Sequence, residues 1–111
     1  MITPGFALPA RYVIHAVGPI WRGGTHGEAD TLERAYESSF RVALAAGDVH
    51  SIAFAAISTG VYGFPKGQAA RIALRVMRRH EASFERIVAC VYSQDDRRIY
   101  EGELGSDSIT T

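Results

Sequence analysis

The chain has 111 residues, of which 12 are basic, 12 are acidic and 47% are hydrophobic. This length allows one folded domain, and the balanced charge argues against binding to duplex nucleic acid. No apolar run is long enough to cross a membrane and no segment has the pattern of a secretory signal, so we expect a soluble protein with no membrane partner.

The first quarter of the chain predicts one strand followed by a loop. Residues 1–10 hold two prolines and a glycine and are expected to be an irregular lead-in. Residues 12–17 are almost continuously apolar, which is typical of a strand covered on both faces. Residues 21–27 include Gly23 and Gly24 and predict a loop.

Small and apolar residues then recur at a spacing of three and four from about Glu28 to Ala46, which predicts a helix with one face toward the core. We expect Asp30 and Glu33 to form a capping arrangement and Gly47 to end the helix. The inward-facing residues are Leu32, Ala35, Tyr36, Ser39, Phe40, Ala43 and Leu44.

The rest of the chain predicts two more strand and helix pairs. Residues 51–56 and 86–92 are apolar and predict buried strands, and 66–80 predict a helix whose last turn, 78–80, is a solvated basic cluster. Asp95 is expected to cap a last helix. The predicted inward-facing residues are Ala69, Ile72, Ala73, Val76 and Met77 in the first of these helices and Ile99, Tyr100 and Leu104 in the second. This alternation predicts an α/β fold with a largely parallel sheet.

The segment 57–65 joins the second predicted strand to the second predicted helix. Ligands of open α/β sheets bind at such loops. Gly60 and Gly63 allow positive φ angles and close approach of a ligand, and Ser58 and Thr59 add hydroxyls. Because the N-terminus of the following helix favours an anion, the segment predicts a phosphate or diphosphate cradle.

A plain turn is the alternative for this segment, since glycine and proline routinely mark turns. The segment is neither a dinucleotide fingerprint nor a P-loop. It carries two aromatic residues, Tyr62 and Phe64, where small polar residues are expected. Aromatic rings beside a phosphate site favour a nucleotide or sugar ligand.

The other chemistry-bearing residues form no complete catalytic set. The four histidines lie on different predicted elements without metal-ligand spacing, so we predict no metal site and no cofactor. His26 and Glu28 have the H-x-E spacing of zinc deaminases, but the companion Pro-Cys-x-x-Cys is missing. Cys90 lies in an apolar strand and is expected to be a packed thiol. As the single cysteine it fits a reducing, cytoplasmic location.

Two longer segments resemble a known family. Residues 2–10 running into 12–19, and then 58–65 with the sequence Ser-Thr-Gly-Val-Tyr-Gly-Phe-Pro, look like the macrodomain, in particular its branch of mono-ADP-ribosyl and O-acetyl-ADP-ribose hydrolases. The similarity spans residues 2–104 in the family's order. It implies a three-layer α/β/α sandwich around a mixed sheet that binds ADP-ribose across the strand ends.

The resemblance also implies site residues. The diphosphate would be wrapped by backbone N–H groups of Ser58 to Tyr62, with Tyr62 by the distal ribose. Tyr92 would pack against adenine, although an aromatic residue at a strand end also covers a core. The implied binding residues are Ser58, Thr59, Gly60, Val61, Tyr62, Gly63 and Tyr92. The implied partner is ADP-ribose, O-acetyl-ADP-ribose or an ADP-ribosylated protein.

The resemblance is incomplete. A full macrodomain has an earlier strand with an aspartate that reads adenine, an asparagine at a strand end and a glycine-rich catalytic loop, none of which this sequence contains. We therefore expect residues 1–104 to be the C-terminal portion of a macrodomain truncated at its N-terminus, and 105–111 to be a disordered tail. Uncovered sheet edges motivate the hypothesis of a homo-oligomer.

Three functions stay open. The chain is part of a hydrolase of ADP-ribose esters or glycosidic bonds, a module that binds ADP-ribose without turnover, or a structural remnant. The catalytic residue is unassigned. Asp95, Asp96 or His26 would serve as a general base only if one of them reached the attacking water.

Overall fold

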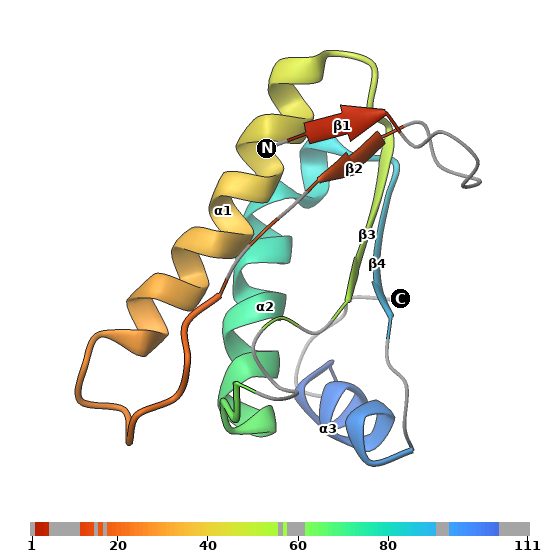
Figure 1. The fold of residues 1–111 in the computed structure, drawn as a ribbon. Coiled ribbons are helices and arrows are strands. Elements are labelled where there is room, and N and C mark those ends of the chain that lie inside the picture. The colour runs from red at the N-terminus through yellow and green to blue at the C-terminus, as the bar shows by residue number, and fades with distance from the viewer. Residues whose placement is uncertain are drawn as a thin grey trace.

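The computed structural model describes residues 2–4, 12–14, 16, 18–55, 57, 62–90 and 94–104 (Figure 1). In chain order its elements are β1 (Ile2–Pro4), β2 (Tyr12–Ile14), α1 (Glu28–Ala46), β3 (Ser51–Ala55), α2 (Lys66–His80), the 3-10 helix η1 (Glu81–Ser83), β4 (Arg86–Cys90) and α3 (Gln94–Leu104). The bounds of α1 and α2 confirm the two predicted helices. None of the described helices is long and apolar enough to cross a membrane.

The described strands form two separate pairs. β3 and β4 are parallel, with Ile52 opposite Ile87 and Phe54 opposite Ala89, as the strand and helix order predicted. β1 and β2 are antiparallel, with Thr3 opposite Val13. The prediction that residues 1–10 are irregular throughout was wrong for 2–4. Proline has no backbone N–H, but it is tolerated at the edge of a sheet or the end of a strand. Pro4 therefore did not prevent the pairing of β1 with β2.

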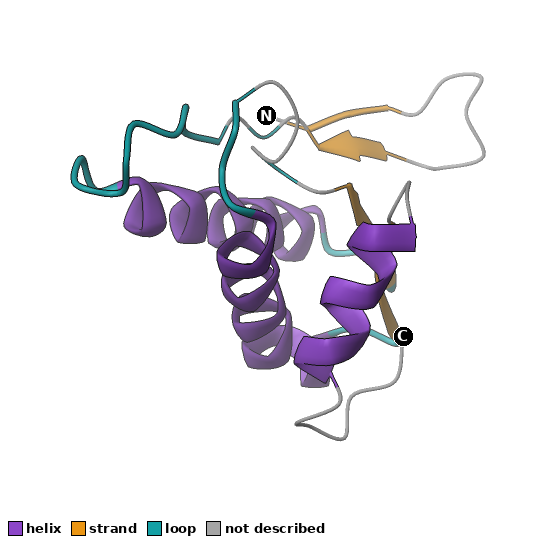
Figure 2. Cartoon of the chain, turned by 90° about the horizontal axis from the view of Figure 1, so that it is seen from below, coloured by secondary structure: helices purple, strands orange, loops and turns teal. Residues whose placement is uncertain are grey.

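The core lies between the helices and one face of the β3–β4 pair. Phe54 projects from β3 toward α1, where its ring centroid lies 5.3 Å from that of Tyr36 and 5.0 Å from that of Phe40. Figures 1 and 2 show α2 between α1 and α3, and Tyr100 of α3 joins the same core. All five residues predicted to face inward from α2 are buried, whereas Leu44 at the end of α1 is 44% exposed.

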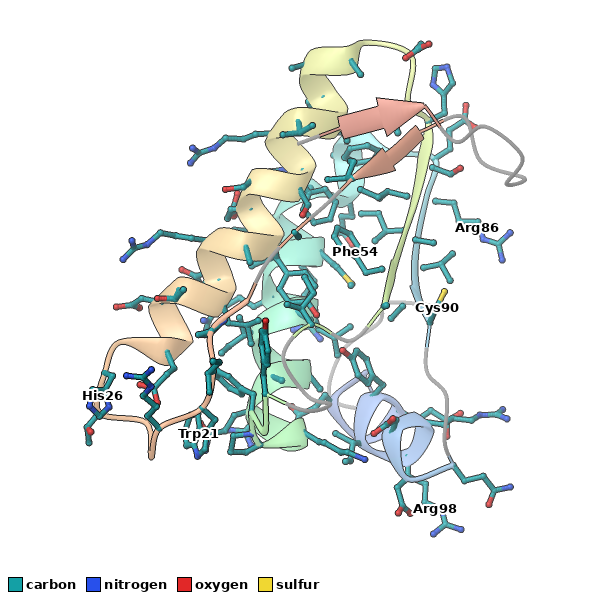
Figure 3. The ribbon with its side chains drawn as sticks, in the orientation of Figure 1. Trp21, His26, Phe54, Arg86, Cys90 and Arg98 are labelled. Atoms are coloured by element: carbon teal, nitrogen blue, oxygen red, sulfur yellow. The ribbon has the colours of Figure 1, made fainter. Side chains whose placement is uncertain are left out.

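The opposite face of β3 and β4 is exposed. Ala53, Ala55 and Cys90 are all exposed there, and Figure 3 shows Cys90 pointing away from the helices, opposite to Phe54. The prediction of Cys90 as a packed thiol was therefore wrong. Residues 87–90 of its strand are apolar on both faces, but within the described part of the chain helices cover only the Phe54 face.

The helix ends differ in part from the predicted caps. The N-cap of α1 is Gly27, without a side-chain hydrogen bond, so the predicted capping by Asp30 and Glu33 was wrong. Gly47 ends α1 in the left-handed conformation as predicted, with φ 81° and its N–H donating to Leu44. Because α3 begins at Gln94, Asp95 lies inside its first turn and does not cap it.

The basic end of α2 is paired with α1. Arg79 donates to Glu37 at 3.0 Å, and His80 Nε2 lies 2.9 Å from the same carboxylate. The His80 ring also stacks on Phe40 with ring centroids 4.5 Å apart. Arg79 and His80 therefore connect α2 to α1. The prediction of a solvated cluster did not include these contacts.

Candidate functional site

The predicted diphosphate loop lies between the C-terminal end of β3 and the start of α2. Of its residues, Ile57 and 62–65 are described, whereas Ser58, Thr59, Gly60 and Val61 lie outside the described residues, as does Tyr92. Gly63 has φ 73°, in the left-handed region that glycine favours. The loop therefore needs glycine at this position, as the sequence predicted.

One end of the loop is fixed to α1. The backbone N–H of Ile57 donates to the hydroxyl of Tyr36 at 3.3 Å, and Tyr36 is 1% exposed. Burial raises the pKa of Tyr36, and its hydroxyl also hydrogen bonds with Tyr100 of α3. The neutral hydroxyl thus connects the start of the loop to both helices.

The other end of the loop is braced by Trp21. The backbone N–H of Trp21 donates to the Tyr62 carbonyl at 2.8 Å, and the Trp21 ring packs at 57° to the Phe64 ring with centroids 4.9 Å apart. Phe64 is only 1% exposed, so its predicted role beside a nucleotide was wrong: it belongs to the core. Tyr62 is 37% exposed.

The start of α2 has no acidic residue in its first turn. Its N-cap is Pro65, whose side chain makes no capping hydrogen bond. By contrast, the first turns of α1 and α3 each contain two acidic residues. Lys66 adds a positive charge and forms an ion pair with Asp96 of α3 at 2.9 Å. Among the described residues, α2 is thus the helix whose N-terminal dipole is not offset by acids of its own first turn.

The loop that carries Trp21 is held by Glu28, a residue that the sequence did not identify as important. Its carboxylate accepts the backbone N–H groups of Arg22, Gly24 and His26 at 2.8, 2.9 and 2.6 Å. Burial raises the pKa of Glu28, but these hydrogen bonds outweigh it and lower the pKa from 4.5 to about 2. An acidic residue directly after a loop with three glycines is the sequence feature that indicates a carboxylate accepting backbone N–H groups of that loop.

The three candidate general bases do not lie together. His26 is exposed on the loop before α1, where its Nδ1 lies 3.1 Å from the Arg22 carbonyl (Figure 3). Asp95 and Asp96 lie on α3, and Asp96 pairs with Lys66. Across the residues that the structure describes, no three His, Cys, Asp or Glu side chains are grouped to hold a metal ion.

Comparisons with known proteins agree with the resemblance. A family model described as Macro domain matches residues 1–73. The chain is 54% identical over 103 residues to a Macro domain-containing protein of Ralstonia nicotianae, covering 93% of this chain and 60% of that protein. It is 49% identical over 104 residues to an O-acetyl-ADP-ribose deacetylase of Citrobacter rodentium, covering 91% and 58%.

A solved structure has the same fold. The Oceanobacillus iheyensis macrodomain with ADP superposes with a TM-score of 0.86 at 34% identity, covering 96% of this chain and 56% of that one. The described helices and the parallel β3–β4 pair are thus those of the macrodomain fold. The chain spans less than two thirds of the length of each of these three relatives.

Proposed function

Because this chain belongs to the Macro domain family, we propose that it binds ADP-ribose or O-acetyl-ADP-ribose at the loop between β3 and α2. The proposed contacts are backbone N–H groups of the loop with the diphosphate, Tyr62 with the distal ribose and Tyr92 with adenine. The full set is Ser58, Thr59, Gly60, Val61, Tyr62, Gly63 and Tyr92. In the context of a complete domain, the same site would hydrolyse O-acetyl-ADP-ribose or mono-ADP-ribosyl esters.

The observation that carries this proposal is the start of α2. A glycine loop leads into a helix whose own first turn has no acid, and the lysine at its first position is paired with Asp96 of α3. The unpaired N–H groups and the dipole of such a helix end favour a bound anion. A diphosphate supplies that negative charge, and the exposed Tyr62 ring supplies a surface for the attached sugar.

A binding module without turnover is the second candidate. It stays open because no catalytic residue is assigned in this chain, and a general base must lie within hydrogen-bond reach of the attacking water. Binding and hydrolysis therefore need separate tests.

Calorimetric titration of ADP-ribose into the protein, with AMP as the control ligand, tests the binding proposal. We expect micromolar affinity, about −8 kcal/mol, and clearly weaker binding of AMP, which lacks the diphosphate. Gly60→Val should abolish binding because it adds a branched side chain where the diphosphate approaches the backbone. Gly102→Val is the matched control, since a Cβ at Gly102 on α3 meets open space.

Two results would argue against the proposal. Unchanged ADP-ribose affinity in folded Gly60→Val would mean that the ligand binds elsewhere. Equal affinity for AMP and ADP-ribose would mean that the diphosphate does not contribute to binding. Release of acetate from O-acetyl-ADP-ribose then separates an enzyme from a binding module.

A further inference from the structure

The Glu28 carboxylate accepts hydrogen bonds from three backbone N–H groups of the loop that precedes α1. Glu28 is 3% exposed, and its Oε2 accepts the N–H groups of Arg22 and Gly24 while its Oε1 accepts that of His26. Three bonds from alternate residues to one buried carboxylate fix the course of the 21–27 loop.

The same loop sets the position of Trp21. A Cβ built on Gly24 would lie 2.7 Å from the Trp21 ring, so the Gly24 backbone lies directly against the indole. The indole also packs against the Phe64 ring, and the backbone N–H of Trp21 donates to the Tyr62 carbonyl. Glu28, Gly24, Trp21 and Tyr62 therefore form a continuous line of contacts into the loop between β3 and α2.

We propose that Glu28 is a positioning residue for that loop. Its carboxylate holds the 21–27 segment in the conformation in which the Trp21 backbone bonds to Tyr62 and the Trp21 ring packs against Phe64. Glu28 touches no ligand in this arrangement. It acts by fixing the direction of the Tyr62 carbonyl and of the left-handed Gly63 beside it. The effect on ligand affinity rests on the proposed function, whereas the effect on Trp21 needs no ligand.

The test uses Glu28→Gln with Asp30→Asn as the matched control. Glutamine replaces one accepting oxygen by an NH₂ donor, so at least one backbone N–H of the 21–27 loop loses its acceptor. Asp30 lies in the same first turn and is exposed, so its variant removes the same charge near the helix dipole without touching the loop. Trp21 is the single tryptophan, which makes its fluorescence a direct reporter.

We expect E28Q to shift Trp21 emission to the red without ligand and to weaken ADP-ribose binding on the order of 10-fold, since the loss of a hydrogen bond to a charged acceptor has a cost of that size. D30N should show wild-type emission and affinity. Glu28→Asp, which keeps the charge but is one methylene shorter, provides a second variant if E28Q does not fold, with the same direction of both changes.

Wild-type emission and wild-type affinity in folded E28Q would overturn the inference. So would an equal change in D30N, because that would trace the effect to charge at the helix end. If the wild-type protein binds no ADP-ribose, the proposed function fails, and the emission of E28Q still decides whether Glu28 positions Trp21.

Discussion

Two neighbouring glycines before α1 allow the free-energy cost of backbone strain to be measured apart from the cost of a steric clash. Gly23 and Gly24 have φ 88° and 89°, but a Cβ meets open space at the first and the Trp21 ring at the second. Gly23→Ala should lower the free energy of unfolding by about 1 kcal/mol, the cost of a left-handed alanine. Gly24→Ala should lower it by a further ~1–3 kcal/mol through overpacking, as measured by urea unfolding. Equal losses in the two variants would mean that the indole moves aside without cost.

The depressed pKa of Glu28 predicts a defined pH dependence of stability. The pKa is about 2 in the folded chain and 4.5 when the carboxyl is free of its partners, so the stabilisation is complete above pH 4.5 and is lost as the pH falls toward 2. The difference in unfolding free energy between wild type and Glu28→Gln should therefore be constant from about pH 5 to 7 and should shrink at about pH 3. Taking the difference cancels carboxyl groups common to both proteins. A difference that does not change with pH would show that Glu28 makes no such hydrogen bonds in solution.

At the scale of elements, the helices were predictable because each carries its own pattern. The apolar stripe of α2 and the glycine after α1 are local signals, and both gave the observed bounds. The caps of α1 and α3 were not predictable in the same way. Asp30 and Asp95 are good capping residues by type, but the first turn begins before each of them. One acid, Glu28, instead turns back to the preceding loop, a contact set by the path of residues 22–26.

Packing between α1 and the elements around it should outweigh the ion pairs on its surface. Phe40 is fully buried against Phe54 and Phe84, whereas Glu33 accepts from Arg75 and Arg79 through side chains about half exposed. We expect Phe40→Ala to cost about 3–5 kcal/mol, a large part of the stability of a domain this size, and Glu33→Gln less than about 1 kcal/mol. Urea unfolding at low and high salt checks both values. Only the Glu33 effect should shrink with salt, so a salt-insensitive loss in that variant would contradict its assignment to ion pairing.

For the whole molecule, the sequence does not show which faces of a sheet are covered by other elements. Residues 87–90 are apolar on both faces, and such a pattern indicates burial on both sides without showing whether both sides are covered. Within the described residues, helices pack only on the Phe54 face. The pairing of β1 with β2 was hidden for a related reason, because a three-residue strand carries almost no pattern of its own and is defined by its partner.

Cys90 provides a direct test of the exposed face. Its thiol is exposed at the end of β4, on the side away from Phe54 (Figure 3), so it should react with an aromatic disulfide reagent in the native protein nearly as fast as in urea. Measuring the rate over a range of protein concentrations adds a second result. A rate that falls as concentration rises would show that copies of the chain cover this face, as expected of a homo-oligomer joined through uncovered strands. A slow rate at every concentration would contradict the exposure of Cys90, because a thiol shielded within one copy stays shielded on dilution.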